Sequence, residues 1–353
     1  MSIAPQMTSA ERVLCALSGK EPDRVPFFLP VTMHGALEMG VPLDEYYQSA
    51  RLLAEGQLRL RAKYRDDIVY PFFYGAIDVQ AFGGEVEFYA DGPPNSVDPL
   101  LSDPQQISNL SPPVVADCEP LRRVLDATEI LSTAIAGEAL TVGVIMSPFS
   151  LPVMQLGFEQ YLNLLYEQPE LARQLHAVNE AFAVSWANAQ LAAGANAIGY
   201  FDPVSSPTVL SGEMFTEFGL PMMRRTLAAI NGPCAALLAS GLCEPLIDDL
   251  VSTNAVIVGA SSDEDLAQVK ATAAGRMTVM GNLNGIEMRR WTADQAREEV
   301  RDAIAAGAPG GGFILSDTHG EIPIQVPEDV LLTICDAVRE FGSYPIDIPN
   351  PDE

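Results

Sequence analysis

A histidine between two carboxylates, in the segment Ser316–Glu321, is the strongest candidate for chemistry in this sequence. His319 follows Asp317 and precedes Glu321 by two residues each. Histidine titrates near neutral pH and can transfer protons, and a neighbouring carboxylate can orient its ring. We predict that His319 is catalytic, or that it binds substrate or a metal, with Asp317 and Glu321 contacting the substrate. A loop histidine bonded to the backbone is the alternative.

A second carboxylate, Asp202, directly follows the apolar run Ala197–Phe201. A carboxylate at the end of a strand can orient a histidine, bind a metal or protonate a leaving group. The loop that follows, Pro203–Pro207, contains two serines, so Asp202 could instead cap that turn. We predict a catalytic role for Asp202 and keep the cap as the alternative.

Further side chains that follow apolar runs are predicted to contact the substrate: His34, Phe72, Tyr74, Ser240 and Asn282. Asparagine both donates and accepts hydrogen bonds, which suits recognition of a substrate amide or hydroxyl. The aromatic rings could form an apolar wall. Turn formation or loop packing would explain the same residues without a ligand. The remaining histidine, His176, lies in a helix-like stretch and is predicted to be structural.

Eight short apolar runs must position these residues, and a helix-like stretch follows each run. Buried parallel strands read as continuous apolar runs because helices cover the sheet. Eight of them alternating with helices predict a (β/α)8 TIM barrel, whose chemistry lies at the carboxyl ends of the strands. The runs are 25–29, 67–70, 141–146, 197–201, 234–238, 255–258, 277–280 and 312–315.

The 353 residues are predicted to form a single domain. Residues 1–24 are predicted to be an N-terminal helical extension, whose short helix opens with a Thr/Ser cap signal at Thr8 and Ser9. Leucine spacing predicts one helix over 43–64. The stretch 85–113 is predicted to be an insertion between the second and third strands, a hairpin and lid over the barrel mouth. Residues 343–353 are predicted to be a loose tail.

The composition excludes several classes of partner. The formal net charge is -27, with only 20 Lys and Arg, so the surface repels nucleic acid and anionic membranes. The sequence has no N-terminal signal pattern and no apolar run of membrane-spanning length. Its five cysteines are scattered without a CxxC pair, which favours reduced thiols. We therefore predict a cytoplasmic protein that acts on a small-molecule substrate.

Several short segments occur in a characteristic order along the chain. By that order and spacing the sequence resembles the uroporphyrinogen decarboxylase superfamily, which includes cobalamin-dependent methyltransferases. The resemblance implies a TIM barrel along nearly the whole chain, and homodimers are common in the superfamily. The segments are Glu11–Leu14, Pro22–Pro26, Val69–Phe72, Gln80–Val86, Pro94–Val97, Ala193–Ile198, Gly281–Leu283, Gly312–Leu315 and Val326–Val330.

The resemblance is greater to the methyltransferase branch than to the decarboxylases. The decarboxylases have an arginine-rich loop where this chain has Thr32–Leu37, without arginine. Their catalytic aspartate falls near Tyr74, and their active-site tyrosine falls near Met154. A porphyrinogen with eight carboxylates needs several bidentate arginine contacts, so decarboxylation of uroporphyrinogen is not expected.

The thiol-activating methyltransferases bind zinc through a histidine and two cysteines. Their positions correspond here to Leu238, Ser240 and His319, so a zinc site of that kind is not expected. Cys243 and Glu244 could rebuild a metal site with His319, and the metal content is left open. The segment at His319 nearly matches a cobalamin-ligand motif but has Ile322 at the glycine position. Any corrinoid is therefore expected on a partner protein or as free cobalamin.

The resemblance and the residues together predict a corrinoid-dependent methyltransferase. A methyl group would move between a small substrate and cobalamin, or a corrinoid protein, and an O-methyl or N-methyl donor fits better than a thiol. A carboxy-lyase acting on a smaller carboxylate and a non-catalytic binding protein are the alternatives.

Overall fold

The computed structural model describes residues 6–71 and 74–347, and it confirms the predicted (β/α)8 barrel. Eight parallel strands neighbour one another in the order β1-β10-β9-β8-β7-β6-β5-β2. Each predicted apolar run overlaps one of these strands. They are β1 (Phe27–Phe28), β2 (Ile68–Val69), β5 (Leu140–Met146), β6 (Ala197–Phe201), β7 (Cys234–Leu237), β8 (Ile257–Gly259), β9 (Thr278–Leu283) and β10 (Phe313–Asp317).

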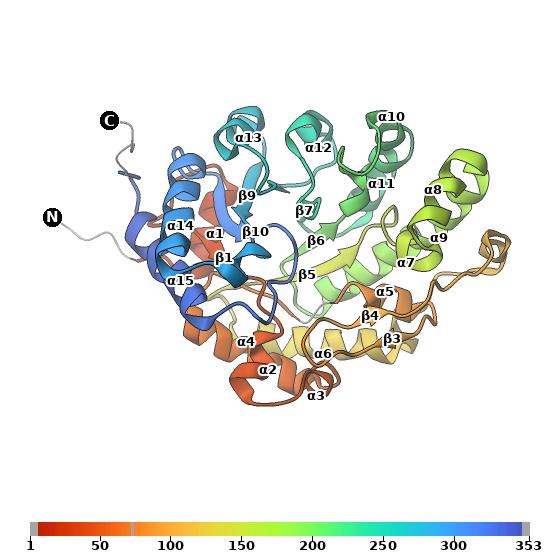
Figure 1. Cartoon of the computed structure of the whole chain (residues 1–353), viewed down its shortest axis with the longest axis horizontal. Coiled ribbons are helices and arrows are strands. Elements are labelled where there is room, and N and C mark those ends of the chain that lie inside the picture. Colours follow the sequence, from red (N-terminus) through yellow and green to blue (C-terminus); the bar gives the residue numbers. More distant parts are fainter. Residues whose placement is uncertain (1–5, 72–73, 348–353) are drawn as a thin grey trace.

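The helices form a ring outside the strands (Figure 1). Around the ring α4 contacts α6, α6 contacts α9, α9 contacts α11, and α12 to α15 follow in order until α15 meets α4. The α-helices are α1 (Ser9–Leu17), α2 (His34–Met39), α3 (Leu43–Tyr47), α4 (Ala50–Tyr64), α5 (Ala76–Ala81), α6 (Glu119–Ala134), α7 (Pro152–Leu156), α8 (Phe158–Glu167), α9 (Pro169–Ala192), α10 (Gly212–Met214), α11 (Leu220–Ala229), α12 (Ile247–Val251), α13 (Leu266–Ala273), α14 (Ala293–Gly307) and α15 (Glu328–Phe341). Short 3-10 turns are η1 (Pro104–Asn109), η2 (Val115–Asp117), η3 (Pro203–Ser205), η5 (Glu244–Leu246) and η6 (Glu287–Arg290), and η4 (Phe215–Gly219) is a π-turn.

The N-terminal helix α1 covers the amino-terminal end of the barrel. Thr8 caps it through a capping box: the Thr8 hydroxyl accepts the Glu11 N–H, and the Glu11 carboxylate accepts the Thr8 N–H. Its buried Val13 and Ala16 pack against inward-facing strand residues such as Ile314. Because α1 fills one end, the open end of the barrel is the carboxyl end of the strands.

Asp67 joins β1 and β2, which share no ladder among the described residues. The Asp67 N–H donates to the Phe27 carbonyl at 2.9 Å, and the Asp67 carboxylate accepts the Phe27 N–H at 3.0 Å. The same buried carboxylate pairs with Arg12 at 2.6 Å and with Arg24 at 2.8 Å. This clasp of Asp67 with Arg12 and Arg24 closes the barrel where a backbone ladder is missing.

Two predictions about connecting segments have different outcomes. The stretch 43–64 forms two helices rather than one, because Ser49 leaves helical geometry and caps α4 by accepting the Leu52 N–H. The predicted hairpin exists as β3 (Val86–Glu87) paired with β4 (Asn95–Ser96). Within the described ranges, no helix has the length and apolar character needed to cross a membrane.

Candidate active site

A cavity of about 210 Å³ lies at the carboxyl ends of the strands. Its walls are mainly apolar, and each strand supplies a residue to it or is directly followed by one. Pro93, from the turn of the β3–β4 hairpin, also reaches the lining, which agrees with the predicted position of the insertion at the mouth. These residues are Phe28, Val144, Phe201, Leu237, Gly259, Met280 and Ser316 in the strands, and Tyr70 directly after β2.

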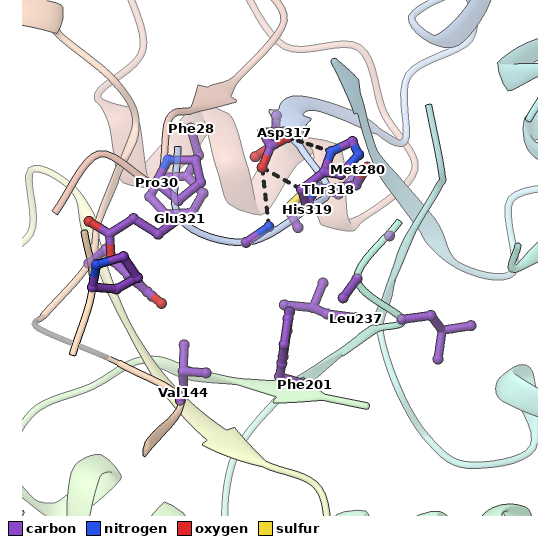
Figure 2. A pocket seen from close by; sticks show the side chains of 18 of the residues that line it. Phe28, Pro30, Val144, Phe201, Leu237, Met280, Asp317, Thr318, His319 and Glu321 are labelled. Carbon is purple, nitrogen blue, oxygen red and sulfur yellow. Dashed lines mark hydrogen bonds and ion pairs between the residues drawn. The ribbon is translucent and has the colours of Figure 1, made fainter. Parts of the chain in front are cut away.

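The polar side of the cavity is built by Asp317 and His319, at the end of β10. The fully buried Asp317 carboxylate contacts the His319 ring, with Oδ1 at 3.1 Å from Nδ1 (Figure 2). Its other contacts are backbone N–H groups: Gly285 donates to Oδ1 at 2.8 Å, and His319 and Gly320 donate to Oδ2 at 3.0 and 3.2 Å. This carboxylate therefore fixes both the loop after β9 and the histidine.

The hydrogen bond with Asp317 raises the pKa of His319 above its usual value, against the opposing effect of burial. Within the described part of the chain, no side-chain hydrogen bond of His319 is made through Nε2, which is therefore available to a ligand. The pair can hold a proton at Nε2 and return it.

Glu321 contributes a second acidic group, at a different edge of the cavity from His319 (Figure 2). Its carboxylate accepts the Met33 N–H at 2.5 Å. Burial of the carboxyl group raises the pKa of Glu321 to about 8, so a proton resides there near neutral pH.

Two hydroxyl groups of the lining have no hydrogen-bond partner among the described residues. These are the buried Oγ of Ser316 and Oγ1 of Thr318. Buried polar groups are nearly always hydrogen-bonded, so these hydroxyls are placed to bond a polar atom of a ligand. The described lining contains no Lys or Arg, and it offers nothing to neutralise a substrate with several carboxylates.

Four of the predicted site residues line this cavity: Tyr74, Asp317, His319 and Glu321. Tyr74 also donates its hydroxyl to Gln80 at 2.8 Å. Phe72, predicted to contact the substrate, lies outside the described residues. The remaining predicted residues lie elsewhere: His34, Asp202, Ser240 and Asn282.

Asp202 is fully buried and does not line the cavity. Its carboxylate accepts hydroxyl hydrogen bonds from Ser147, Ser150 and Ser205, each at 2.6 Å. Burial raises its pKa, and the serine bonds oppose that effect. Asp202 makes no side-chain cap hydrogen bond to the turn that follows it; its carboxylate instead organises the loops after β5 and β6 through these serines.

His34 lies in a separate small pocket with Lys63 and Glu328, and burial lowers its pKa to about 4. Ser240 does not line the main cavity, but its N–H donates to the carbonyl of the lining residue Thr318 at 2.9 Å. Asn282 donates its side-chain amide to the Ser261 carbonyl at 3.0 Å and faces a different surface pocket.

The positions that correspond to the zinc ligands of thiol-activating relatives do not fit zinc. Leu238 is apolar and lines the cavity, Ser240 holds a backbone turn, and only His319 offers a nitrogen ligand. Cys243 is buried, and its N–H bonds to Glu264. No group of three or more His, Cys, Asp or Glu within residues 6–71 and 74–347 is arranged to hold a metal ion.

Sequence reasoning missed Phe28, Phe201, Ser316 and Thr318 as lining residues. Phe28 and Phe201 belong to the recognised apolar runs, and Ser316 directly follows the last run. The available signal was position: residues at the carboxyl ends of barrel strands face the mouth.

The fold and the cavity define a TIM-barrel protein with its site at the carboxyl end of the barrel. The chain belongs to the uroporphyrinogen decarboxylase family, whose model, described as Uroporphyrinogen decarboxylase (URO-D), matches residues 8–341. The resemblance inferred from the sequence is thereby confirmed.

Relatives in this family include two kinds of enzyme. The chain is 24% identical to methylcobamide:CoM methyltransferase MtaA of Methanosarcina barkeri, over 87% of this chain and 93% of that protein. It is 27% identical to uroporphyrinogen decarboxylase of Cellvibrio japonicus, over 60% of this chain and 61% of that protein's length. A methyltransferase structure from Methanosarcina mazei has the same fold, with a TM-score of 0.84, 20% identity and coverage of 95% of this chain and 99% of that one.

Proposed function

We propose that this protein is a methyltransferase that moves a methyl group between a small substrate in the cavity and a corrinoid. The observation that carries the proposal is the cavity itself: it is apolar, has one Asp–His pair, and its described lining has no Lys or Arg. A polycarboxylate substrate would meet two carboxyl groups there, Asp317 and Glu321, and His319 as the one group of the described lining that can carry positive charge. The match with a methylcobamide:CoM methyltransferase over 87% of the chain supports the choice.

The corrinoid is a co-substrate in this proposal, on a partner protein or free. A cavity of about 210 Å³ is far too small to enclose a corrin ring, so the ring would lie across the mouth. When bound, a corrinoid supplies a cobalt ion that exchanges the methyl group.

The chain's own residues bind the substrate and supply the proton that the demethylated group needs. The raised pKa of His319 keeps a proton available at the ring, and Asp317 holds the ring in place. Nε2 can donate that proton to an ether oxygen as its methyl group leaves, or to the neutral amine that remains after an ammonium group has lost its methyl. The mainly apolar walls exclude water from the substrate.

The test mixes the purified protein with cobalamin reduced to the Co(I) state and a panel of O-methyl and N-methyl compounds. Methyl transfer is followed by the change in the cobalamin absorption spectrum. His319→Gln should lower kcat by about 100-fold or more, the usual effect of losing an acid–base group. His34→Gln, outside the cavity, is the matched control and should retain kcat. Unchanged kcat in His319→Gln, or no transfer from any donor, would overturn the proposal.

A further inference from the structure

We propose that the substrate of this cavity is a methylated ammonium cation, held by aromatic rings and balanced by the Glu321 carboxylate. The inference names the substrate class of the site described above. It rests on the proposed function for turnover, but binding of the cation can be tested without it.

Aromatic rings stand on several sides of the cavity. Phe28 and Tyr70, from neighbouring strands, form an edge-to-face pair with ring centroids 5.7 Å apart. Tyr74 follows them along the chain, and Phe201 lines the cavity from the end of β6. Methylated ammonium groups are recognised by aromatic rings, because each ring face carries partial negative charge and the methyl groups have no N–H that needs an acceptor.

The charges of the lining favour a cation when Glu321 is ionised. Asp317 and Glu321 are its carboxylates, and the positive charge available to oppose them is that of protonated His319. Asp317 neutralises that charge directly and is held by backbone N–H groups. Glu321 accepts one backbone N–H, from Met33, and the Thr32 side chain also favours its ionised form. It therefore has fewer donors than Asp317 and retains capacity for a counter-ion.

Glu321 is placed to lose its proton as the cation binds and to regain it when the cation leaves. The titratable side chains facing it are Tyr46, Tyr47 and Tyr70, and burial raises the pKa of each, so they stay neutral. The Asp317–His319 pair faces the same cavity. Because the pKa of Glu321 is about 8, affinity for a cation should rise as pH increases through that value.

The size of the cavity and its hydroxyl groups further restrict which methylated ammonium compounds would fit as substrates. A volume of about 210 Å³ accommodates a small head group rather than a large ligand. The unpartnered Ser316 and Thr318 hydroxyls can bond a polar tail. Choline is therefore a suitable probe, since it joins a quaternary ammonium group to a hydroxyl.

The experiment compares choline with its neutral carbon isostere, 3,3-dimethylbutan-1-ol, by isothermal titration calorimetry on the full chain. The two probes have the same shape and differ in charge. Choline should bind at least about tenfold more tightly, as expected for a desolvated cation–π site. Equal affinities, or tighter binding of the alcohol, would overturn the proposal.

Variants separate charge from packing. Glu321→Gln should reduce choline affinity about tenfold, leave the alcohol unchanged, and abolish the rise in choline affinity between about pH 6.5 and about pH 9. His319→Gln should retain that rise. Phe28→Leu should lower the preference for choline over the alcohol. Glu328→Gln, an exposed change in another pocket, should affect neither probe. Thermal unfolding of each variant checks that its fold is intact.

The outcomes distinguish this inference from the proposed function. Selective choline binding without methyl transfer from any donor would leave the inference standing and overturn the proposed function. Methyl transfer from a neutral methyl ether, without selective choline binding, would do the reverse. Loss of affinity for both probes in Glu321→Gln, with an intact fold, would show that Glu321 shapes the cavity rather than balancing a charge, and would overturn the inference.

Discussion

Replacing Asp317 by asparagine removes the carboxylate on which the polar side of the cavity depends. Its oxygens accept four hydrogen bonds: Oδ1 from Gly285 N–H and the His319 ring, and Oδ2 from the N–H groups of His319 and Gly320. An asparagine side chain offers one oxygen, so in either orientation its NH₂ group faces two former donors. Two bonds to a charged group, at about 1.5 kcal/mol each, give a destabilisation of about 3 kcal/mol.

The stability lost by Asp317→Asn should depend on pH. The raised folded-state pKa of His319 means that its ion pair stabilises the fold fully below the unfolded value, about pH 6.5. That contribution is lost as pH rises through the folded-state pKa. The difference between wild type and Asp317→Asn should therefore shrink toward alkaline pH but not vanish, because the backbone bonds to Asp317 remain.

Urea unfolding followed by circular dichroism at several pH values measures the loss, and NMR titration of the His319 ring measures its pKa. Asp248→Asn is the matched control, since it breaks an exposed ion pair with Arg276 and should cost under about 1 kcal/mol. The reasoning fails if Asp317→Asn costs no more than this control, or if the pKa of His319 does not fall.

Three further changes test other parts of the structure. Gly285→Ala would place a methyl carbon 2.6 Å from Asp317 Oδ1, so NMR should show a lower His319 pKa although no charge is altered; an unchanged pKa would refute this. Asp202→Asn should destabilise the protein by about 2 kcal/mol in urea, because serine hydroxyls lose acceptors, while leaving choline affinity within about twofold; a larger change would place Asp202 in the site. Asp67→Asn should cost about 3 kcal/mol or more, because it removes the carboxylate partner of Arg24 and leaves Arg12 paired with Asp23 alone; a shift in urea midpoint no greater than that of the exposed control would contradict it.

The fold could be predicted because buried parallel strands are continuous apolar runs, and these can be recognised in a single sequence. The strand ends were less clear. β9 and β10 continue to Leu283 and Asp317, beyond the predicted ends at 280 and 315. Polar residues such as Asn282 and Ser316 interrupt the apolar pattern there, although their backbones still pair.

The prediction for Asp202 shows that a residue's position at the end of a strand does not determine which way its side chain points. Neighbouring residues at a strand end point to opposite faces, and Phe201 occupies the face toward the cavity. Asp202 consequently meets serines of neighbouring loops. His34 stands six residues beyond β1, at the start of α2, where it is turned toward a different pocket. Side-chain direction after a strand ends depends on loop geometry, which the sequence alone does not specify.

At the clasp, β1 and β2 can separate without breaking the backbone hydrogen bonds between the other pairs of strands. At that point the ring is closed by the buried clasp of Asp67 with Arg12 and Arg24 instead of a backbone ladder, so we expect local opening to cost less there than between paired strands. Backbone amides near the clasp should exchange with solvent faster than those of β9 and β10. Phe28 and Tyr70, which stand beside this opening, also form a wall of the cavity. The rate of ligand entry should therefore depend on local separation of β1 and β2 as well as on access through the mouth of the barrel.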